Sequence, residues 1–282
     1  MTEGRVVLVG TPIGNLGDLS PRARESLAGA AVIFCEDTRR TRKLLSAAGI
    51  PAPRLVAMHQ HNESAASAEA LALACGGGVV AVVSDAGMPG ISDPGTRLVA
   101  LAAGEGVPVE VVPGPAAFLT ALVGSGLPTA RFCFEGFLPR RGRERTERLR
   151  AISAEARTTV LYESPRRVAA TLADLSSACG HNRRVALGRE LTKLHEEFWR
   201  GRLGDALEWV EAGEPRGEWV IVLDGAAPEP ITAGEEEITS ALRRHLAAGE
   251  TRRTAVDAVA AELSIPRRQV YELAINQARD QP

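Results

Sequence analysis

Three turn-rich segments combine glycine, proline and polar side chains in a pattern that suits ligand binding. They are residues 10–19, 84–95 and 112–117. In residues 84–95, three glycines and two prolines prevent regular structure, while two carboxylates and two hydroxyls offer polar contacts. The third segment opens a stretch of small residues, which would let a ligand approach the backbone at a helix start. The three segments together indicate a binding site lined by loops, although tight turns and close helix packing would also explain the first and third.

The first segment departs from the dinucleotide-binding fingerprint. Its glycines, Gly10, Gly14 and Gly17, are more widely spaced than in Gly-x-Gly-x-x-Gly, and Pro12 lies between them. Glu36-Asp37 nevertheless falls where a ribose-binding acid would lie, so the dinucleotide interpretation stays open at this point.

Arginines gather at three places that could contact phosphate. They are Arg39 and Arg40, Arg166 and Arg167, and a run of six between residues 140 and 150 that includes Arg141. On a helix, Arg141, Arg145 and Arg148 would share a face and form a phosphate track, although Glu–Arg pairs within the helix are an equal alternative. Because the net charge is only −2, any contact with RNA must come from such local patches.

Four side chains are candidates for a general base, and no pattern separates them. They are Glu36, Asp37, Glu190 and His195. The last two belong to a connection of mixed charge between two expected strands, which as a lone motif would usually be a solvated loop. No group of side chains has the spacing of metal ligands, so no metal is expected, and the four separated cysteines are interpreted as buried free thiols.

The elements that must position these residues alternate β-branched runs with amphipathic stretches, as in an α/β fold. Expected strands cover residues 6–9, 32–34, 55–58, 79–83 and 109–112, then 132–137, 158–162, 185–189, 197–201 and 219–223. Expected helices begin at Ser20-Pro21 and cover residues 38–48, 143–154 and 166–179. Because the last two strands follow with short connections, we expect antiparallel pairing and a mixed second sheet.

The end of the chain has helical periodicity throughout. A Pro-, Ala- and Gly-rich linker at residues 224–234 precedes helices at 235–248, 254–263 and 266–278. The last two resemble a helix-turn-helix with Ala255, Val259, Leu263, Val270 and Leu273 facing inward, and a helical bundle without a nucleic-acid role is the alternative. We therefore predict domains at residues 1–127, 128–225 and 235–282.

Composition excludes disordered and fibrous classes. Of 282 residues, 45% are hydrophobic and 24% are charged, the ordinary balance of a soluble globular protein. The first apolar run is too short for a signal sequence or a membrane span, so a cytosolic protein is expected.

Seven motifs in register resemble the tetrapyrrole methylase superfamily, and within it the branch of ribosomal RNA small subunit methyltransferase I. They read GTPIGNLGDLSPRA, FCEDTRRTRKLL, VSDAGMPGISDPG, VVPGPAA, FEGFLPRRG, LYESPRR and RELTKLHEE. The resemblance covers residues 5 to about 225. It implies a two-domain fold with mixed sheets, S-adenosylmethionine in the cleft between the domains, and 2′-O-methylation of a cytidine ribose in 16S ribosomal RNA.

The resemblance also implies a set of site residues. The cofactor contacts would be Pro12, Asp85, Ala86, Gly87, Pro115, Ala116, Ala117 and Tyr162, and Arg39, Arg40, Arg141, Arg166 and Arg167 would contact RNA. A homodimer acting on ribosomal RNA or the assembled small subunit, away from membranes, is expected. In corrinoid relatives the loop after the fourth strand reads Gly-Asp-Pro, whereas here it reads Ser84-Asp85-Ala86-Gly87. The alternatives are a methylase of small tetrapyrroles and a nucleic-acid-binding regulator that uses the terminal helices.

Overall fold

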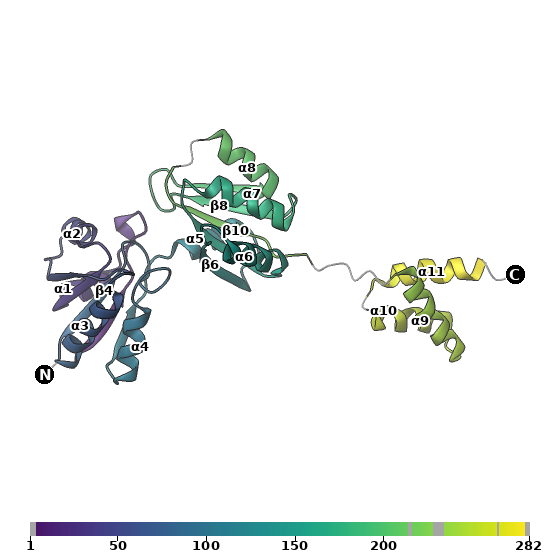
Figure 1. The fold of residues 1–282 in the computed structure, drawn as a ribbon, viewed down its shortest axis with the longest axis horizontal. Coiled ribbons are helices and arrows are strands. Elements are labelled where there is room, and N and C mark those ends of the chain that lie inside the picture. The colour runs from purple at the N-terminus through teal and green to yellow at the C-terminus, as the bar shows by residue number, and fades with distance from the viewer. Residues whose placement is uncertain (1–3, 214–215, 228–233, 264, 280–282) are drawn as a thin grey trace. The chain divides into compact units, whose positions relative to one another are not determined.

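The computed structural model describes residues 4–213, 216–227, 234–263 and 265–279, with side chains up to residue 275. The chain divides into two compact units, of which the first ends at Ala226 and the second begins at Ala227. The first unit contains two five-stranded sheets and the second contains three helices (Figure 1).

The first sheet is entirely parallel. Its strands are β1 (Arg5–Val9), β2 (Val32–Cys35), β3 (Arg54–Ala57), β4 (Val79–Val83) and β5 (Val109–Val112), in the order β3-β2-β4-β1-β5. Valine dominates these strands because both faces of the central strands are covered, whereas Val111 on the edge strand β5 is 53% exposed. Along β1, Val7 and Val9 pack toward α1 and α2, whereas Val6 and Leu8 pack toward α3 and α4.

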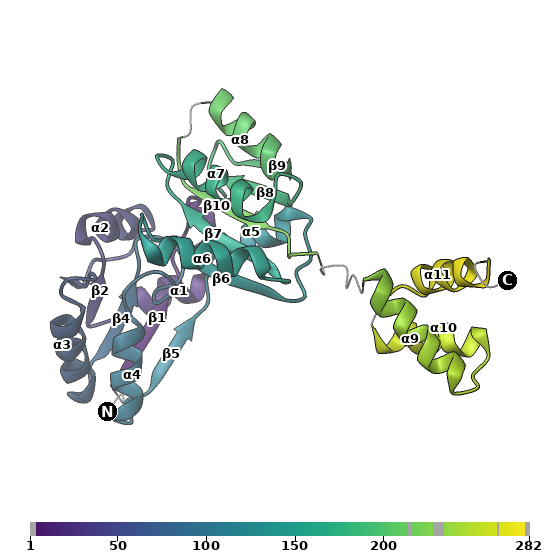
Figure 2. The ribbon, with the colours of Figure 1, turned by 45° about the vertical axis from the view of Figure 1, so that its right-hand side comes forward.

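The four covering helices lie two on each face of this sheet (Figure 2). They are α1 (Pro21–Ala28), α2 (Thr38–Ala47), α3 (Glu63–Cys75) and α4 (Thr96–Gly104), and a 3-10 turn, η1 (Leu16–Asp18), precedes α1. The Ser20 hydroxyl caps α1 by accepting a 3.1 Å hydrogen bond from the Ala23 amide, with Pro21 at the first helical position.

The second sheet is mixed. Its strands are β6 (Phe132–Phe137), β7 (Thr158–Glu163), β8 (Arg184–Arg189), β9 (Glu197–Arg202) and β10 (Trp219–Leu223), in the order β6-β7-β10-β8-β9. Only β6 and β7 pair in parallel. Helices α6 (Arg143–Ala154), α7 (Val168–Cys179) and α8 (Leu203–Ala212) pack on one face, and α5 (Ala117–Ser125) packs on the other.

The predicted fold class, with its mixed second sheet, is confirmed, but the connection before the last strand is longer than expected. Helix α8 separates β9 from β10, and these two strands are not neighbours, because β8 lies between them. The Leu203, Ala206 and Val210 side chains are buried at helical spacing, a signal that the sequence interpretation missed. The predicted boundary after residue 127 remains a prediction, and α5 on its N-terminal side packs on the second sheet.

The second unit consists of α9 (Glu235–Ala247), α10 (Arg252–Glu262) and α11 (Arg267–Arg279) around a separate apolar cluster. Among the residues expected to face inward, Ala255, Val259 and Val270 are buried, and Leu263 and Leu273 pack partly against them. The predicted turn includes Ser264, which lies outside the described residues. No helix in the described part of the chain has the length and apolarity needed to cross a membrane.

Candidate active site

A cavity of about 370 Å³ lies where the strand ends of the two sheets of the first unit meet. From the first sheet it is lined by Ile13, Glu36, Arg40, residues 85–88, residues 91–93 and residues 116–118. From the second it is lined by Phe137, residues 162–165, Leu191 and residues 218–220. Ligands of open α/β sheets bind at the carboxyl ends of strands, which is where these residues are gathered.

The loops that follow β1, β4 and β5 are fastened to one another. Thr11 and Gly87 exchange backbone hydrogen bonds of 2.8 and 3.1 Å, and the buried Thr11 hydroxyl donates to the Ser84 carbonyl. A Cβ on Gly10 would lie 2.6 Å from the Gly114 backbone, so these two loops touch at positions where only glycine fits. The loops that carry the lining residues Ile13, Gly87 and Ala116 are therefore held together by their backbones.

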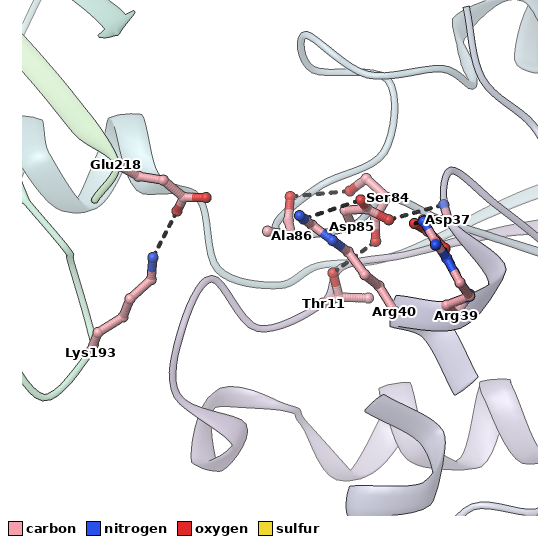
Figure 3. Close-up of polar contacts among 9 residues, drawn as sticks. All are labelled: Thr11, Asp37, Arg39, Arg40, Ser84, Asp85, Ala86, Lys193 and Glu218. Atoms are coloured by element: carbon pink, nitrogen blue, oxygen red, sulfur yellow. Dashed lines mark hydrogen bonds and ion pairs between the residues drawn. The ribbon is translucent and has the colours of Figure 1, made fainter. Parts of the chain in front are cut away.

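The charged side chains that line the cavity are mostly acidic. Five lining residues carry carboxylates and one, Arg40, carries a positive charge. Arg40 Nη1 lies 3.3 Å from Asp85 Oδ2, and the Asp37 amide donates to Asp85 Oδ1 at 3.0 Å (Figure 3). Burial, and then the nearby Asp85 charge, raise the pKa of Glu36. Such a wall favours a cationic ligand or a group that gives up a proton and disfavours phosphate.

Aromatic side chains form the opposite wall. Tyr162 on β7 contacts Phe134 and Phe137 at ring-centroid distances of 5.0 and 5.5 Å. Its phenolic oxygen accepts a 3.3 Å hydrogen bond from the Phe118 amide in the first turn of α5. Burial raises the pKa of Tyr162 to about 12, so the ring stays neutral. This wall offers an apolar surface to a flat ligand.

Behind the aromatic wall, a buried carboxylate organises the entrance to α7. Glu163 accepts hydrogen bonds from the Ser164 amide at 2.8 Å and from the Thr171 hydroxyl at 2.7 Å. Arg145 donates to that hydroxyl at 3.1 Å and to the Pro139 carbonyl at 2.9 Å, and Arg167 donates to the Leu138 carbonyl at 2.7 Å. The two guanidinium groups thus fix residues 138–139, just after Phe137 at the cavity.

The loop between β8 and β9 closes the cavity beside η1. Lys193 Nζ lies 3.0 Å from Glu218 Oε2, as Figure 3 shows. It also lies 2.7 Å from Glu190 Oε1. A Cβ on Gly14 would lie 2.3 Å from the Lys193 side chain, so the loop after β1 touches the loop after β8 here. Within the described residues, the non-glycine residues with positive φ are Ser92, Glu190 and Thr192, all in loops around the cavity. Strained backbone of this kind is concentrated at functional sites.

Comparison with known proteins identifies the family of this site. The tetrapyrrole (corrin/porphyrin) methylase family model matches residues 5–207. A Synechocystis protein named ribosomal RNA small subunit methyltransferase I is 45% identical over 278 residues, which cover 98% of this chain and 99% of that protein. The chain belongs to the ribosomal RNA small subunit methyltransferase I family. The family inferred from the seven motifs is thereby confirmed.

Other members and neighbours extend the comparison. The Escherichia coli O157:H7 protein of the same name is 41% identical, with 98% of this chain and 96% of that protein covered. A Thermotoga maritima member is 45% identical over 222 residues, which are 79% of this chain but 99% of that protein. Two solved structures share the fold. Diphthine synthase has a TM-score of 0.60 and 15% identity, with 78% of this chain and 90% of that chain covered. A Thermus thermophilus uroporphyrin-III C-methyltransferase complexed with S-adenyl homocysteine has a TM-score of 0.56 and 22% identity, with 78% of this chain and 97% of that chain covered.

Most of the cofactor contacts expected in this family meet at the cavity. Asp85, Ala86, Gly87, Ala116, Ala117 and Tyr162 line it. Pro12 and Pro115 do not, but each adjoins a lining residue, and the Pro115 carbonyl lies 3.4 Å from the position of a Cβ on Gly87. Six residues from three separate segments therefore meet at one cavity, although their assignment to a cofactor stays a prediction.

The four candidate bases separate in the structure. Glu36 lines the cavity. Asp37 caps α2 and accepts hydrogen bonds from the Arg39 side chain and amide, which hold the pKa of that carboxyl well below its usual range. Burial would raise the pKa of Glu190, but hydrogen bonds from Lys193 and the Glu218 amide lower it. His195 is exposed and does not line the cavity. Glu36 is thus the candidate of the four that faces the site.

The candidate RNA-binding arginines differ in how far they are already engaged. Arg39 pairs with Asp37 at 2.7 Å with an 86% exposed side chain, and Arg40 pairs with Asp85. Arg141 and Arg166 are exposed and, among the described residues, have no ion-pair partner. Arg167 is half-buried against the Leu138 carbonyl. It precedes α7, which begins at Val168 rather than at the arginines.

The predicted phosphate track along Arg141, Arg145 and Arg148 is wrong. Arg145 is buried and bound to Asp174 at 2.7 Å, and Arg148 lies 3.2 Å from Glu135. Helix α6 begins at Arg143, so Arg141 lies outside it. The alternative explanation by Glu–Arg pairs within the helix applies to Arg143 and Glu147, which are 2.6 Å apart.

Sequence reasoning did not select Asp93, Glu163, Glu218 or Phe137, which line the cavity. Asp93 was recognised only as one of two carboxylates in the loop after β4, and its proximity to Glu36 depends on the sheet order, which brings β2 beside β4. Glu163 follows Tyr162 in a buried strand, and an acid in that position was a usable signal.

Proposed function

We propose that the protein transfers a methyl group from S-adenosylmethionine to the 2′-hydroxyl of a cytidine ribose in small-subunit ribosomal RNA. The observation that carries the proposal is an acid-lined cavity bounded by family motifs from both sheets. Its relatives bear the name ribosomal RNA small subunit methyltransferase I. The uroporphyrin methyltransferase that shares its fold was crystallised with the product S-adenyl homocysteine.

The cavity suits this cofactor in size and chemistry. A volume of about 370 Å³ lies within the range of small-molecule sites. The backbone of Ala86, Ala116 and Ala117 lines the cavity where the polar ends of the molecule would lie, and Tyr162 offers a face for its adenine. The Gly87 amide and carbonyl stay paired with Thr11. The surplus of carboxylates suits a positively charged sulfonium. When bound, S-adenosylmethionine supplies the electrophilic methyl group.

The protein's contribution to the reaction is alignment. Methyl transfer to oxygen is an in-line displacement, so donor and acceptor must be held at near contact. The loops after β1 and β4 are fixed by the Thr11–Gly87 bridge, and the Phe118–Tyr162 hydrogen bond ties the α5 end of the cavity to the second sheet. These contacts limit the freedom of any molecule seated between them.

Exposed arginines at the rim of the acidic cavity and outside it are proposed to bind the RNA backbone. The set is Arg39, Arg40, Arg141 and Arg166, with Arg167 acting mainly through the 138–139 backbone. Phosphate contacts position nucleic acid, and each one lost lowers the salt slope of binding by about one. Replacing Arg39 and Arg40 by Ala should make subunit methylation collapse, and Arg39→Ala alone, outside the cavity lining, should leave cofactor affinity within about twofold. An unchanged rate and salt slope would contradict this assignment.

A homodimer acting in the cytoplasm is the proposed form. Supporting it, Val123 on α5 is 76% exposed, and Leu119 and Val111 are also exposed apolar residues on α5 and β5. Light scattering at micromolar concentration should give twice the chain mass, and Val123→Glu should give monomers. A monomeric parent protein would contradict the dimer.

The decisive experiment compares RNA acceptors with a tetrapyrrole acceptor. The pure protein is incubated with methyl-labelled S-adenosylmethionine and either small ribosomal subunits, free 16S RNA or uroporphyrinogen. Label in RNA, located on a cytidine 2′-oxygen, supports the proposal, and label in uroporphyrinogen alone would replace it with tetrapyrrole methylation. Asp85→Arg should lose cofactor binding in calorimetry, because Asp85 lies at the cavity and its replacement brings a cation toward the sulfonium.

A further inference from the structure

Asp93 differs from every other carboxylate that lines the cavity. Asp85 accepts from Arg40 and from the Asp37 amide, and Glu163 accepts from Thr171 and the Ser164 amide. Glu218 pairs with Lys193, and Glu36 accepts from the Asp85 amide.

Asp93 has only the Ser84 hydroxyl as a donor and, in the described part of the chain, no cation or backbone amide. That hydroxyl also lies 3.2 Å from the Ala86 carbonyl, to which it can donate instead. The carboxylate of Asp93 therefore retains lone pairs for a substrate.

Two backbone amides of the loop that carries Asp93 fix its conformation by hydrogen bonds. The Gly95 amide donates to Glu63 Oε1 on α3 at 2.9 Å, and the Gly90 amide donates to the Pro94 carbonyl at 3.1 Å. Ser92 has φ of 62°, and its hydroxyl lies 3.1 Å from the position of a Cβ on Gly136, at the bulge of β6. A strained residue kept in place beside a cavity-lining carboxylate is typical of a preorganised catalytic group.

We propose that Asp93 is the general base that takes the proton of the ribose 2′-hydroxyl as the methyl group is transferred. The inference rests on the proposed function. The sulfonium carbon–sulfur bond breaks, its electron pair stays on sulfur, and a carbon–oxygen bond forms to the ribose. The hydroxyl proton passes to the Asp93 carboxylate. The positive charge of the sulfonium and the negative charge of the carboxylate disappear together, which favours the step inside a poorly solvated cavity.

The neighbours of Asp93 give it a suitable affinity for a proton. Burial, then the Glu36 charge and more weakly Asp85, raise the pKa of Asp93 to about 6. It is thus ionised at neutral pH and more basic than an ordinary aspartate. The other ionisable groups facing this cluster are Arg40 on α2 and Tyr162 on β7, and His59 after β3 acts on Glu36. None of them donates a hydrogen bond to Asp93.

The test combines three variants with two readouts. Asp93→Asn removes the base, Glu36→Gln removes the charge that increases its basicity, and Asp205→Asn is an exposed control away from the cavity. Single-turnover methylation of small subunits is measured from pH 5 to 8 at saturating S-adenosylmethionine. Carboxyl ¹³C signals of labelled aspartate are titrated in the ligand-free protein.

We expect Asp93→Asn to slow methylation at saturating S-adenosylmethionine by about a hundredfold or more, the usual contribution of a general base. The acidic limb of the pH–rate profile should vanish, together with one carboxyl signal that titrates near 6. Glu36→Gln should move the acidic limb of the profile and the titration of that carboxyl signal to lower pH. A rate within threefold of the parent, or a limb that persists in Asp93→Asn, would overturn the inference. Failure of the parent protein to methylate subunits would instead overturn the proposed function.

Discussion

Removing the charge of Asp93 should make the protein more stable. A pKa raised from 3.8 to about 6 means that at neutral pH the fold holds a carboxylate that ionises more easily in the unfolded chain. At 1.36 kcal/mol per pKa unit the cost is about 3 kcal/mol. Because Asp93 is only half-buried, solvent screening reduces this to about 1.5 kcal/mol.

The sign and the pH window of this effect follow from linkage. Below the unfolded pKa both states are protonated and Asp93 costs nothing. The cost develops as pH rises, reaching about a third of its final value at pH 4.5 and all of it by pH 7. Asp93→Asn should therefore raise the melting temperature by about 3–6 °C at pH 7 and by about a third of that at pH 4.5.

Differential scanning calorimetry of the parent and Asp93→Asn proteins at both pH values measures the difference. For Asp205→Asn, a substitution at an exposed position of α8, the melting temperature should stay close to that of the parent protein at both pH values. A variant that is less stable than the parent at pH 7, or a shift in melting temperature that does not depend on pH, would refute the reasoning.

Three further predictions follow from contacts near the cavity. Thr171→Val should cost about 1–3 kcal/mol in urea unfolding because it leaves buried Glu163 short of a donor, whereas Thr171→Ser should retain most of the stability. Gly87→Ala should weaken cofactor binding in calorimetry about tenfold, because φ at Gly87 is 81° and the added Cβ would lie 3.4 Å from Pro115 and Ile13. Gly104→Ala is the control, because a Cβ there meets open space, and it should leave cofactor binding unchanged. Residues 1–226 alone should bind S-adenosylmethionine with the affinity of the full chain, because the cavity lies wholly within them, and a loss above threefold would implicate the terminal helices.

The sequence predicts the strands and loop positions well because their signals are local. Residues 79–83, 109–112, 132–137 and 219–223 agree with the observed strands to the residue. Buried parallel strands are almost continuously β-branched, and such runs need no tertiary information to recognise. The binding loops follow directly, since they begin where those strands end.

The properties that the sequence did not reveal are those produced by pairing across the fold. From the sequence, Arg145 is expected to be a solvated residue of a charged helix. In the structure it is buried and donates hydrogen bonds to Asp174, the Pro139 carbonyl and the Thr171 hydroxyl. The significance of Asp93 depends on Glu36, which is distant in sequence and brought near by the order of strands. Similarly, the Asp37 carboxylate is already engaged, because it caps α2 and accepts hydrogen bonds from Arg39.

Helix α5 limits where this protein can be divided. It continues from β5 of the first sheet, yet Ala121 and Leu122 are buried against Val160 and Ala186 of the second. A fragment that ends at residue 127 would carry these apolar side chains unburied, and the complementary fragment would expose a sheet face. Both would be prone to aggregate. Splitting the gene before residue 117 keeps that packed layer whole, and it is the position at which reassembly from two separately expressed halves has a physical basis.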